Sequence, residues 1–340
     1  MEKPPYTATD EINDTSMAAP HVVILGAGAS IAATPHGDLH GKTLPSMANF
    51  VDVLGLRPVL NSFDIPYQTG DNFEVVYASV AADPTKKAAA FAIEQAVVDY
   101  FSDLRLPDTA TVYDRLVLSL RGKDLIATFN WDPFLYMACY RNRLVGELPH
   151  VVYLHGSVAT AYCFEHKKKS TPGASCSVCR EPLVPSKLLF PIEQKNYSED
   201  KFINAEWKGL QAALKAAYLI TIFGYGAPTS DVEAVALMKE AWGDTYRREL
   251  EQTEIIDIRD PDELADLWEP FIHTHHYDVH SDFAASWLTN HPRRTCEAAW
   301  QQFMECQYLD QYPLPATDDL RELQDRVAPR VQVEKDSRSA

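Results

Sequence analysis

The sequence has little of several features that define whole classes of protein. It holds only six cysteines in 340 residues, too few for a disulfide scaffold, which predicts a reducing, cytoplasmic environment. No segment carries about 18 uninterrupted apolar residues, so we expect no transmembrane helix. Basic residues are in the minority, with 31 Lys and Arg against 48 Asp and Glu and a net charge of −17. Direct nucleic-acid binding is therefore not expected, because phosphates attract a basic surface.

The two ends of the sequence are poor in apolar patterns. The opening stretch MEKPPYTATDEINDTSMAAP lacks the apolar core of a secretory signal, and we expect residues 1–20 to form a disordered leader. Residues 316–340 are charged and poor in apolar side chains, which predicts a flexible tail. A short helical segment, CEAAWQQFMECQYL, is expected within 291–315.

Between the ends, short apolar runs alternate with helical patterns. Continuous apolar runs are typical of buried parallel strands, and they cover residues 21–26, 124–130, 150–156, 218–226 and 253–260. Helical patterns cover residues 73–104 with an interruption at Pro84, 205–217 and 231–242. This alternation predicts an α/β fold, a doubly wound parallel sheet of the Rossmann type with helical insertions, over residues 21–290. Ligands of such sheets bind at the carboxyl ends of the strands.

The first expected strand leads into LGAGASIAATPHG. Gly26 and Gly28 would let the backbone approach a pyrophosphate, and Ser30 could donate a further hydrogen bond. The full dinucleotide fingerprint is absent, because Ile31 stands at its third glycine and no acidic residue closes a second strand about 20 residues on. A tight turn without a ligand is the alternative.

Polar residues follow the second and third expected strands. In TFNWD, Asn130 and Asp132 flank Trp131, either as an Asx turn or as hydrogen-bonding groups of a nucleotide pocket. In VVYLHGSV, His155 stands where the strand turns at Gly156. A lone histidine there is commonly just a hydrogen-bonded polar residue, so its role depends on what shares its pocket.

The fourth strand ends in another glycine turn, FGYGAPTSD. Gly224 and Gly226 could admit a phosphate or a ribose. Ser230 or Asp231 is expected to cap the next helix, which leaves either residue a purely structural role.

Four potential metal ligands lie between the third and fourth strands. Cys163, His166, Cys176 and Cys179 form the pattern C-x2-H-x9-C-x2-C within a module at about 160–182. Two short ligand pairs across a loop suit tetrahedral zinc held by three thiolates and one imidazole. With no open ligand position such a zinc would be structural. The alternative is surface thiols beside an unrelated histidine.

A second histidine cluster, HTHHY, covers residues 273–277. Alternate residues of a strand face one side, so His273 and His275 could bind one metal ion. A half-exposed strand without a metal is the preferred interpretation.

Taken in order, GAGAS, TFNWD, LHG, the Cys/His cluster and FGYGAPTSD resemble the motifs of the sirtuin family over roughly residues 21–260. The resemblance implies that NAD+ is the ligand, that His155 is the catalytic histidine, that Asn130 orders a water or the ribose, and that Asp132 faces the nicotinamide carboxamide. The residues it implies in NAD+ binding are Gly26, Ala27, Gly28, Ser30, Thr128, Gly224, Gly226, Ser230 and Asp257.

Three departures from deacylase sirtuins bear on the activity. Phe129 replaces the glutamine of T-Q-N-[IV]-D, HGDLHGKTLPSM replaces the DFR stretch, and LLFPIEQKNYSED replaces the strand that pairs with an acyl-lysine peptide. These features are similar to those of the sirtuin-like NADases of bacterial anti-phage defence, many of which lack the zinc module. The expected activity is hydrolysis of NAD+, which is then a substrate, beside a structural zinc.

Other activities stay open: a protein deacylase or ADP-ribosyltransferase, or a catalytically silent module that binds NAD or ADP-ribose within a complex. Because uncontrolled NAD+ hydrolysis is toxic, we expect control by a homo-oligomer or by a separate regulatory partner protein. The polar, turn-rich segment 31–47 is the expected gate.

Overall fold

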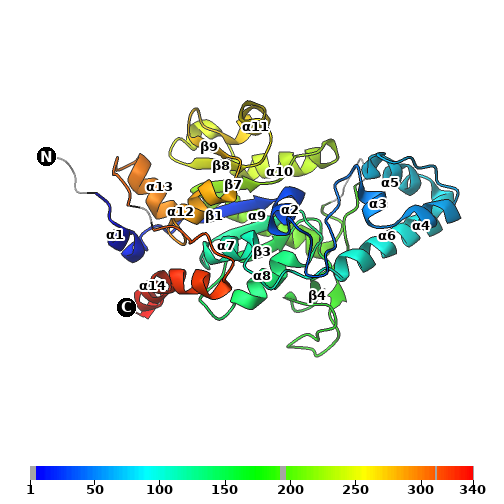
Figure 1. The fold of residues 1–340 in the computed structure, drawn as a ribbon, viewed down its shortest axis with the longest axis horizontal. Coiled ribbons are helices and arrows are strands. Elements are labelled where there is room, and N and C mark those ends of the chain that lie inside the picture. The colour runs from blue at the N-terminus through cyan, green and yellow to red at the C-terminus, as the bar shows by residue number, and fades with distance from the viewer. Residues whose placement is uncertain (1–4, 192–196, 311, 340) are drawn as a thin grey trace.

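The computed structural model describes residues 5–191, 197–310 and 312–339 (Figure 1). Its centre is a six-stranded sheet in the order β3-β2-β1-β7-β8-β9, with every pair of neighbours parallel. The strands are β1 (His21–Leu25), β2 (Leu125–Thr128), β3 (His150–Tyr153), β7 (Leu219–Phe223), β8 (Gln252–Ile256) and β9 (Tyr277–His280). This order is that of a doubly wound Rossmann sheet, which confirms the predicted fold class.

Helices cover both faces of the sheet because both faces of its strands are apolar. In β1, Val22 and Ile24 pack on one face and Val23 and Leu25 on the other, as the alternation of side chains along a strand requires. The first face is covered by α9 (Lys201–Ala216), α10 (Val232–Trp242) and α11 (Pro261–Trp268), and the second by α2 (Ala27–Ala33), α7 (Val112–Leu118) and α8 (Phe134–Asn142).

Between α2 and α7 the chain forms a helical lobe at one end of the molecule (Figure 1). Its elements are α3 (Phe50–Val53), α4 (Arg57–Ser62), α5 (Phe73–Ala81), the 3-10 helix η1 (Pro84–Lys86) and α6 (Lys87–Ser102). Pro84 interrupts the long helical pattern as predicted, because it cannot continue the hydrogen bonding of α5. The rings of Phe50 and Phe101 lie 6.4 and 5.8 Å from that of Trp131, which holds the lobe beside the end of β2.

A small antiparallel sheet, in the order β5-β4-β6, follows β3. It consists of β4 (Ala161–Cys163), β5 (Lys168–Ser170) and β6 (Val184–Pro185). The remaining short elements are η2 (Thr229–Asp231), η3 (Thr245–Arg247), η4 (Glu269–Phe271), η5 (Phe283–Ala285) and α12 (Trp287–Asn290). Over the described residues, no helix combines the length and the apolar character that crossing a membrane requires.

The described parts of both chain ends contain helices, so the predictions of a disordered leader and a flexible tail are wrong there. Residues 8–13 form α1 (Ala8–Asn13), which packs against the C-terminal helix α14 (Leu320–Ser339). Glu11 of α1 is fully buried and accepts hydrogen bonds from Arg330 (2.8 Å) and His291 (2.6 Å). The low apolar content of these segments does not make them disordered, because charged side chains can be buried when they pair with one another.

Of the region expected to be helical, 291–315, the described residues form a helix only at α13 (Thr295–Phe303). The expected strand at 273–277 is also displaced. His273 and His275 lie before β9, which begins at Tyr277, so they do not alternate across a sheet. Their rings instead contact that of His276, at 5.5 and 4.9 Å.

The buried pair of Glu11 and Arg330 gives a stability test. Arg330→Met should lower the free energy of unfolding by about 3–5 kcal/mol, because Glu11 would lose a buried partner. Arg321→Ala, an exposed position at the start of the same helix, is the control and should change it by less than about 0.5 kcal/mol. Urea denaturation measures both, and an unchanged midpoint for Arg330→Met would show that the pair of Glu11 and Arg330 does not stabilise the fold.

Candidate active site and metal cluster

A cavity of about 290 Å³ opens at the carboxyl ends of β1, β2, β3 and β7. From the sheet side it is lined by Gly26, Ala27, Ser30, Phe129, Asn130, Trp131, Asp132, His155, Gly224, Tyr225, Gly226, Pro228 and Asp231. The loop after α2 and the helical lobe add Leu44, Pro45, Met47, Phe50, Glu74 and Phe101, and the chain after β6 adds Leu189 and Pro191. The cavity therefore lies where a doubly wound sheet binds its ligands.

The loops after β1 and β7 pack backbone against backbone. Gly28 N–H donates to the carbonyl of Gly224 at 3.0 Å. A Cβ added to Gly26 would lie 2.4 Å from the Cα of Tyr225, and one added to Gly28 would lie 2.8 Å from the Cα of Gly224. The glycine pattern thus serves a close approach between two loops, and this approach brings Gly26 and Gly224 to the same cavity.

Asn130 and Asp132 belong to one buried hydrogen-bond network with the first loop. The Asn130 Nδ2 group donates to the carbonyl of Gly26 and to Ser30 Oγ, both at 2.8 Å. Ser30 Oγ donates to Asp132 Oδ2 at 2.6 Å. Burial raises the pKa of Asp132 to about 6. Asp132 also accepts the backbone N–H of Phe134 at 3.0 Å, so the Asx turn and the pocket role coexist.

His155 faces a cluster of aromatic and acidic side chains. Its Nε2 atom lies 3.3 Å from the hydroxyl of Tyr197 and 3.7 Å from Asp231 Oδ1. The hydroxyl of Tyr225 donates to the other oxygen of Asp231 at 3.0 Å. Ser230 or Asp231 is expected to cap the helix that follows. Asp231 does stand at the N-cap position of α10, but its side chain makes no capping hydrogen bond and lies beside the histidine instead.

The position of His155 is fixed by the turn after it. Gly156 has a φ of +75°, and a Cβ there would lie 1.8 Å from the carbonyl oxygen of Lys187. The chain returning from the small sheet then donates from Leu189 N–H to the His155 carbonyl at 2.9 Å. The ring of Phe129 meets His155 edge-on at 4.8 Å and stacks flat on Tyr225 at 4.1 Å. A buried, oriented imidazole is therefore presented to the cavity.

Four residues that the resemblance implied in ligand binding do not line this cavity. Gly28 serves the loop packing, and Thr128 Oγ1 accepts the backbone N–H of Asn130 at 3.0 Å. Ser230 donates to Glu74 at 3.1 Å, which links the loop after β7 to the helical lobe. Asp257 pairs with Arg259 at 2.9 Å.

The sequence reading missed several residues that hold the site together: Tyr113, Tyr197, Tyr225 and Asp231. Tyr225 and Asp231 stand within the FGYGAPTSD motif after β7, where a polar side chain at the end of a strand can indicate a role in the site. Tyr113 lies inside a helix, and no local pattern distinguishes it from an ordinary core tyrosine.

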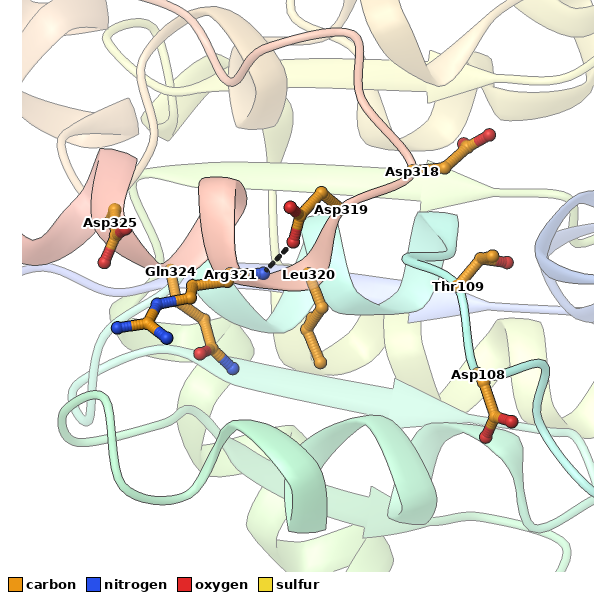
Figure 2. Close-up of a pocket in the computed structure, with 8 residues that line it drawn as sticks. All are labelled: Asp108, Thr109, Asp318, Asp319, Leu320, Arg321, Gln324 and Asp325. Atoms are coloured by element: carbon orange, nitrogen blue, oxygen red, sulfur yellow. Dashed lines mark hydrogen bonds between the residues drawn. The ribbon is translucent and has the colours of Figure 1, made fainter.

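A second, larger hollow of about 730 Å³ lies at the start of α14 and is lined partly by Asp108, Asp318, Asp319 and Asp325. Figure 2 shows that these carboxylates point in different directions. Asp319 accepts the backbone N–H of Arg321 at 2.8 Å and so caps α14. The group has no convergent arrangement for a ligand.

The four metal-binding side chains predicted from the C-x2-H-x9-C-x2-C pattern do come together. The ligand atoms of Cys163, His166, Cys176 and Cys179 lie within 4.8 Å of one another. The sulfurs of Cys163 and Cys179 are 3.8 Å apart, and His166 Nδ1 lies 3.6 Å from the sulfur of Cys163. Zinc–sulfur bonds of about 2.3 Å at tetrahedral angles place two sulfurs about 3.8 Å apart. The geometry therefore fits tetrahedral zinc.

The chemistry of the cluster supports the same fit. The backbone N–H groups of Val178 and Cys179 lower the pKa of the Cys176 thiol to about 6, which favours the thiolate that a metal requires. Cys163 ends strand β4, so the cluster is built on the small antiparallel sheet. Within the described ranges, this is the one group of His, Cys, Asp and Glu side chains close enough to hold a metal ion.

No family model matches this chain, and no curated protein is significantly similar to it in sequence. Among solved structures it is similar to a Sir2 homologue in complex with ADP-ribose, at 13% identity and a TM-score of 0.41 over 95% of this chain and 96% of that one. It is also similar to a Sir2 homologue in complex with NAD, at 13% identity and a TM-score of 0.34 over 93% of both chains. These values establish no family.

Metal content tests the cluster directly. Elemental analysis should find one zinc per chain, and Cys176→Ser should lose it and lower the melting temperature by several degrees, because binding energy at a structural site is folding energy. Cys306→Ser, at an exposed cysteine, is the matched control and should keep the metal. A zinc-free wild-type protein with an unchanged melting temperature would contradict the assignment.

The buried carboxyl group of Asp132 should make the free energy of unfolding depend on pH. Its pKa in the folded chain, about 6, lies above the ordinary 3.8, so between about pH 4 and 6 the folded state holds a proton that the unfolded state has released. Stability must then fall as pH rises through this window, by about 3 kcal/mol for this group.

Asp132→Asn should remove that part of the pH dependence, whereas Asp325→Asn, at an exposed aspartate, should not. The measurement is urea unfolding at pH 4.5 and 7. The comparison concerns the difference between the two pH values, so any constant loss of stability in the variant cancels. Equal pH dependence in wild type and Asp132→Asn would rule out a protonated carboxyl group at this position.

Proposed function

We propose that this protein is an NAD+ hydrolase that cleaves the bond between nicotinamide and ribose. The observation that carries the proposal is the convergence of Asn130 and His155, from the ends of β2 and β3, on a cavity also lined by the glycine loops of β1 and β7. The order of the motifs in the sequence, which resembles that of sirtuins, identifies NAD+ as the ligand to test.

The reaction depends more on the positioning of the ribose and the attacking water than on acid catalysis. Nicotinamide leaves the ribose C1′ as a neutral molecule from a cationic precursor, so its nitrogen needs no proton. Water adds to the oxocarbenium-like centre, giving ADP-ribose, nicotinamide and a proton. Asn130 would hold the water or a ribose hydroxyl in place. His155 would accept the proton, an effect worth roughly 10²–10⁴-fold in rate.

Asp231 suits a supporting role toward His155. Its carboxylate lies 3.7 Å from Nε2 and both side chains are buried, so a proton taken up by the imidazole is stabilised by a nearby negative charge. Tyr225 holds the other carboxylate oxygen.

Hydrolysis is favoured over deacylation by Phe129. Deacylase sirtuins carry a glutamine that touches the ribose at this position, and here the phenyl ring is committed to a stack with Tyr225. The segment that replaces the peptide-pairing strand falls partly on residues 192–196, outside the described residues. A deacylase, an ADP-ribosyltransferase and a silent NAD or ADP-ribose binding module remain the outcomes that the assay below separates.

The wider role follows from the toxicity of the reaction. The proposal includes a cytoplasmic, regulated effector of anti-phage defence that depletes NAD+, held in check by self-association or by a partner protein. Leu44, Pro45 and Met47, all within the expected gate, line the cavity, so a movement of that segment would open or close it. Rates measured over a range of protein concentrations, with and without candidate partners, test this control.

Two substitutions test the activity. Asn130→Ala and His155→Ala should each lower the release of nicotinamide from NAD+ by at least about 100-fold. The matched control is His150→Ala, at the exposed first residue of β3, the strand that leads to His155, which should leave the rate unchanged. Chromatography of the products measures the rate.

The products also decide between the alternatives. Free ADP-ribose supports hydrolysis. Cleavage that requires an acyl-lysine peptide would make the protein a deacylase, label on a protein acceptor would make it a transferase, and binding without turnover would make it a silent module. Full activity of either variant would refute the assignment of the site.

A further inference from the structure

The hydrogen-bond network behind Asn130 ends at a residue that does not reach the cavity. Tyr113 lies in α7, is fully buried, and places its hydroxyl 2.7 Å from Ser30 Oγ and 3.2 Å from Asn130 Nδ2. We infer that Tyr113 is a positioning residue for Asn130: together with Ser30 and the carbonyl of Gly26 it fixes which end of the asparagine amide faces the cavity. This inference rests on the proposed function, because it assigns a task to the end that is exposed.

The orientation of the amide follows from counting donors and acceptors. The carbonyl oxygen of Gly26 can only accept, so the group of Asn130 that lies 2.8 Å from it must be the donating NH₂. The second N–H of that group is directed to Ser30 Oγ, also at 2.8 Å. Both amide protons are therefore used inside the protein.

The hydroxyl of Ser30 is equally committed. Its single proton goes to Asp132 Oδ2 at 2.6 Å. Its two lone pairs are then left to accept, one from Asn130 and one from Tyr113. Tyr113 must be the donor in its contact with Ser30, since the serine has no second proton. Burial raises the pKa of Tyr113, so the phenol keeps its proton.

The consequence lies at the other end of the amide. Oδ1 of Asn130 has no hydrogen-bond partner among the described residues, and Asn130 lines the cavity. An atom that can only accept hydrogen bonds is thus presented where a water or a ribose hydroxyl would donate one. Without the Tyr113 hydroxyl, Ser30 would have an unused lone pair and a free space beside it, and the amide would hold its orientation less firmly.

Tyr113 is itself held by the start of its helix. Thr111 and Asp114 form a reciprocal cap on α7, in which the carboxylate of Asp114 accepts the backbone N–H of Thr111 at 2.7 Å. Arg141 donates to the same carboxylate group at 2.5 Å. The phenol is therefore attached to a rigid element, which is what a positioning role requires.

The test is Tyr113→Phe, which removes one oxygen atom and keeps the ring. Under the inference kcat for NAD+ cleavage falls about tenfold or more while KM stays within about twofold, since only the placement of the attacking molecule is disturbed. Tyr218→Phe is the matched control: Tyr218 is also buried, and among the described residues its hydroxyl has no hydrogen-bond partner. It should leave both constants unchanged.

A second readout separates positioning from general loosening of the fold. With methanol added, the ratio of O-methyl-ADP-ribose to ADP-ribose should change in Tyr113→Phe and stay at the wild-type value in Tyr218→Phe, because only the first alters the group that holds the nucleophile. Unchanged kcat and product ratio would overturn the inference and leave the hydrolase proposal standing. If Tyr113→Phe does not fold, Ser30→Ala interrupts the same network and is expected to change kcat and product ratio in the same direction.

Failure of the hydrolase proposal would appear differently, as a wild-type protein that does not cleave NAD+. The side-chain amide of Asn130 then provides the test by nuclear magnetic resonance, its signal identified from its loss in Asn130→Ala. Two slowly exchanging protons that exchange faster in Tyr113→Phe but not in Tyr218→Phe would support the positioning role. Equal exchange in all three proteins would overturn it.

Discussion

The site depends on a contact between two backbones. Gly28 and Gly224 approach so closely that neither tolerates a Cβ, and the hydrogen bond between them ties the loop after β1 to the loop after β7. These strands are neighbours at the point where the order of the sheet reverses. Because the two loops leave the sheet together, the carbonyl of Gly26 comes within reach of Asn130 and the ring of Tyr225 comes to lie on Phe129. The contact between the two loops thus positions both Asn130 and Tyr225 at the cavity.

The cavity combines an apolar wall with a few buried ionisable groups. Burial raises the pKa of Asp132, and its carboxylate accepts a hydrogen bond from Ser30. Asp231 is equally buried but lies against His155 and Tyr225. Two carboxyl groups in one cavity thus have different partners, one tied to Asn130 through a serine and the other to the imidazole. Such a division suits a reaction in which one group places the nucleophile and another takes its proton.

The sequence predicted the sheet well because its strands are buried on both faces and read as continuous apolar runs. It also predicted the metal cluster, whose ligands are chemically distinctive and closely spaced. It failed where the signal is not local. Glu11 and Arg330 are more than 300 residues apart in sequence, and each looks like an ordinary surface charge until the other is seen beside it. Asp231 stands at the N-cap position of α10, and only the fold shows that its side chain lies beside His155 rather than capping the helix.

Phe129 links the shape of the cavity to the kind of chemistry it favours. A glutamine at this position would offer hydrogen bonds to a ribose, whereas the phenyl ring offers none and packs against both Tyr225 and the edge of His155. Under the proposed function, the ribose hydroxyls would be left to the remaining polar groups of the cavity, Asn130 and the pair formed by His155 and Asp231. An acyl-transfer pathway needs a ribose held for attack by a peptide carbonyl, but hydrolysis needs only a water held at the same carbon. Under the proposed function, a phenyl ring at this position therefore disfavours acyl transfer more than hydrolysis.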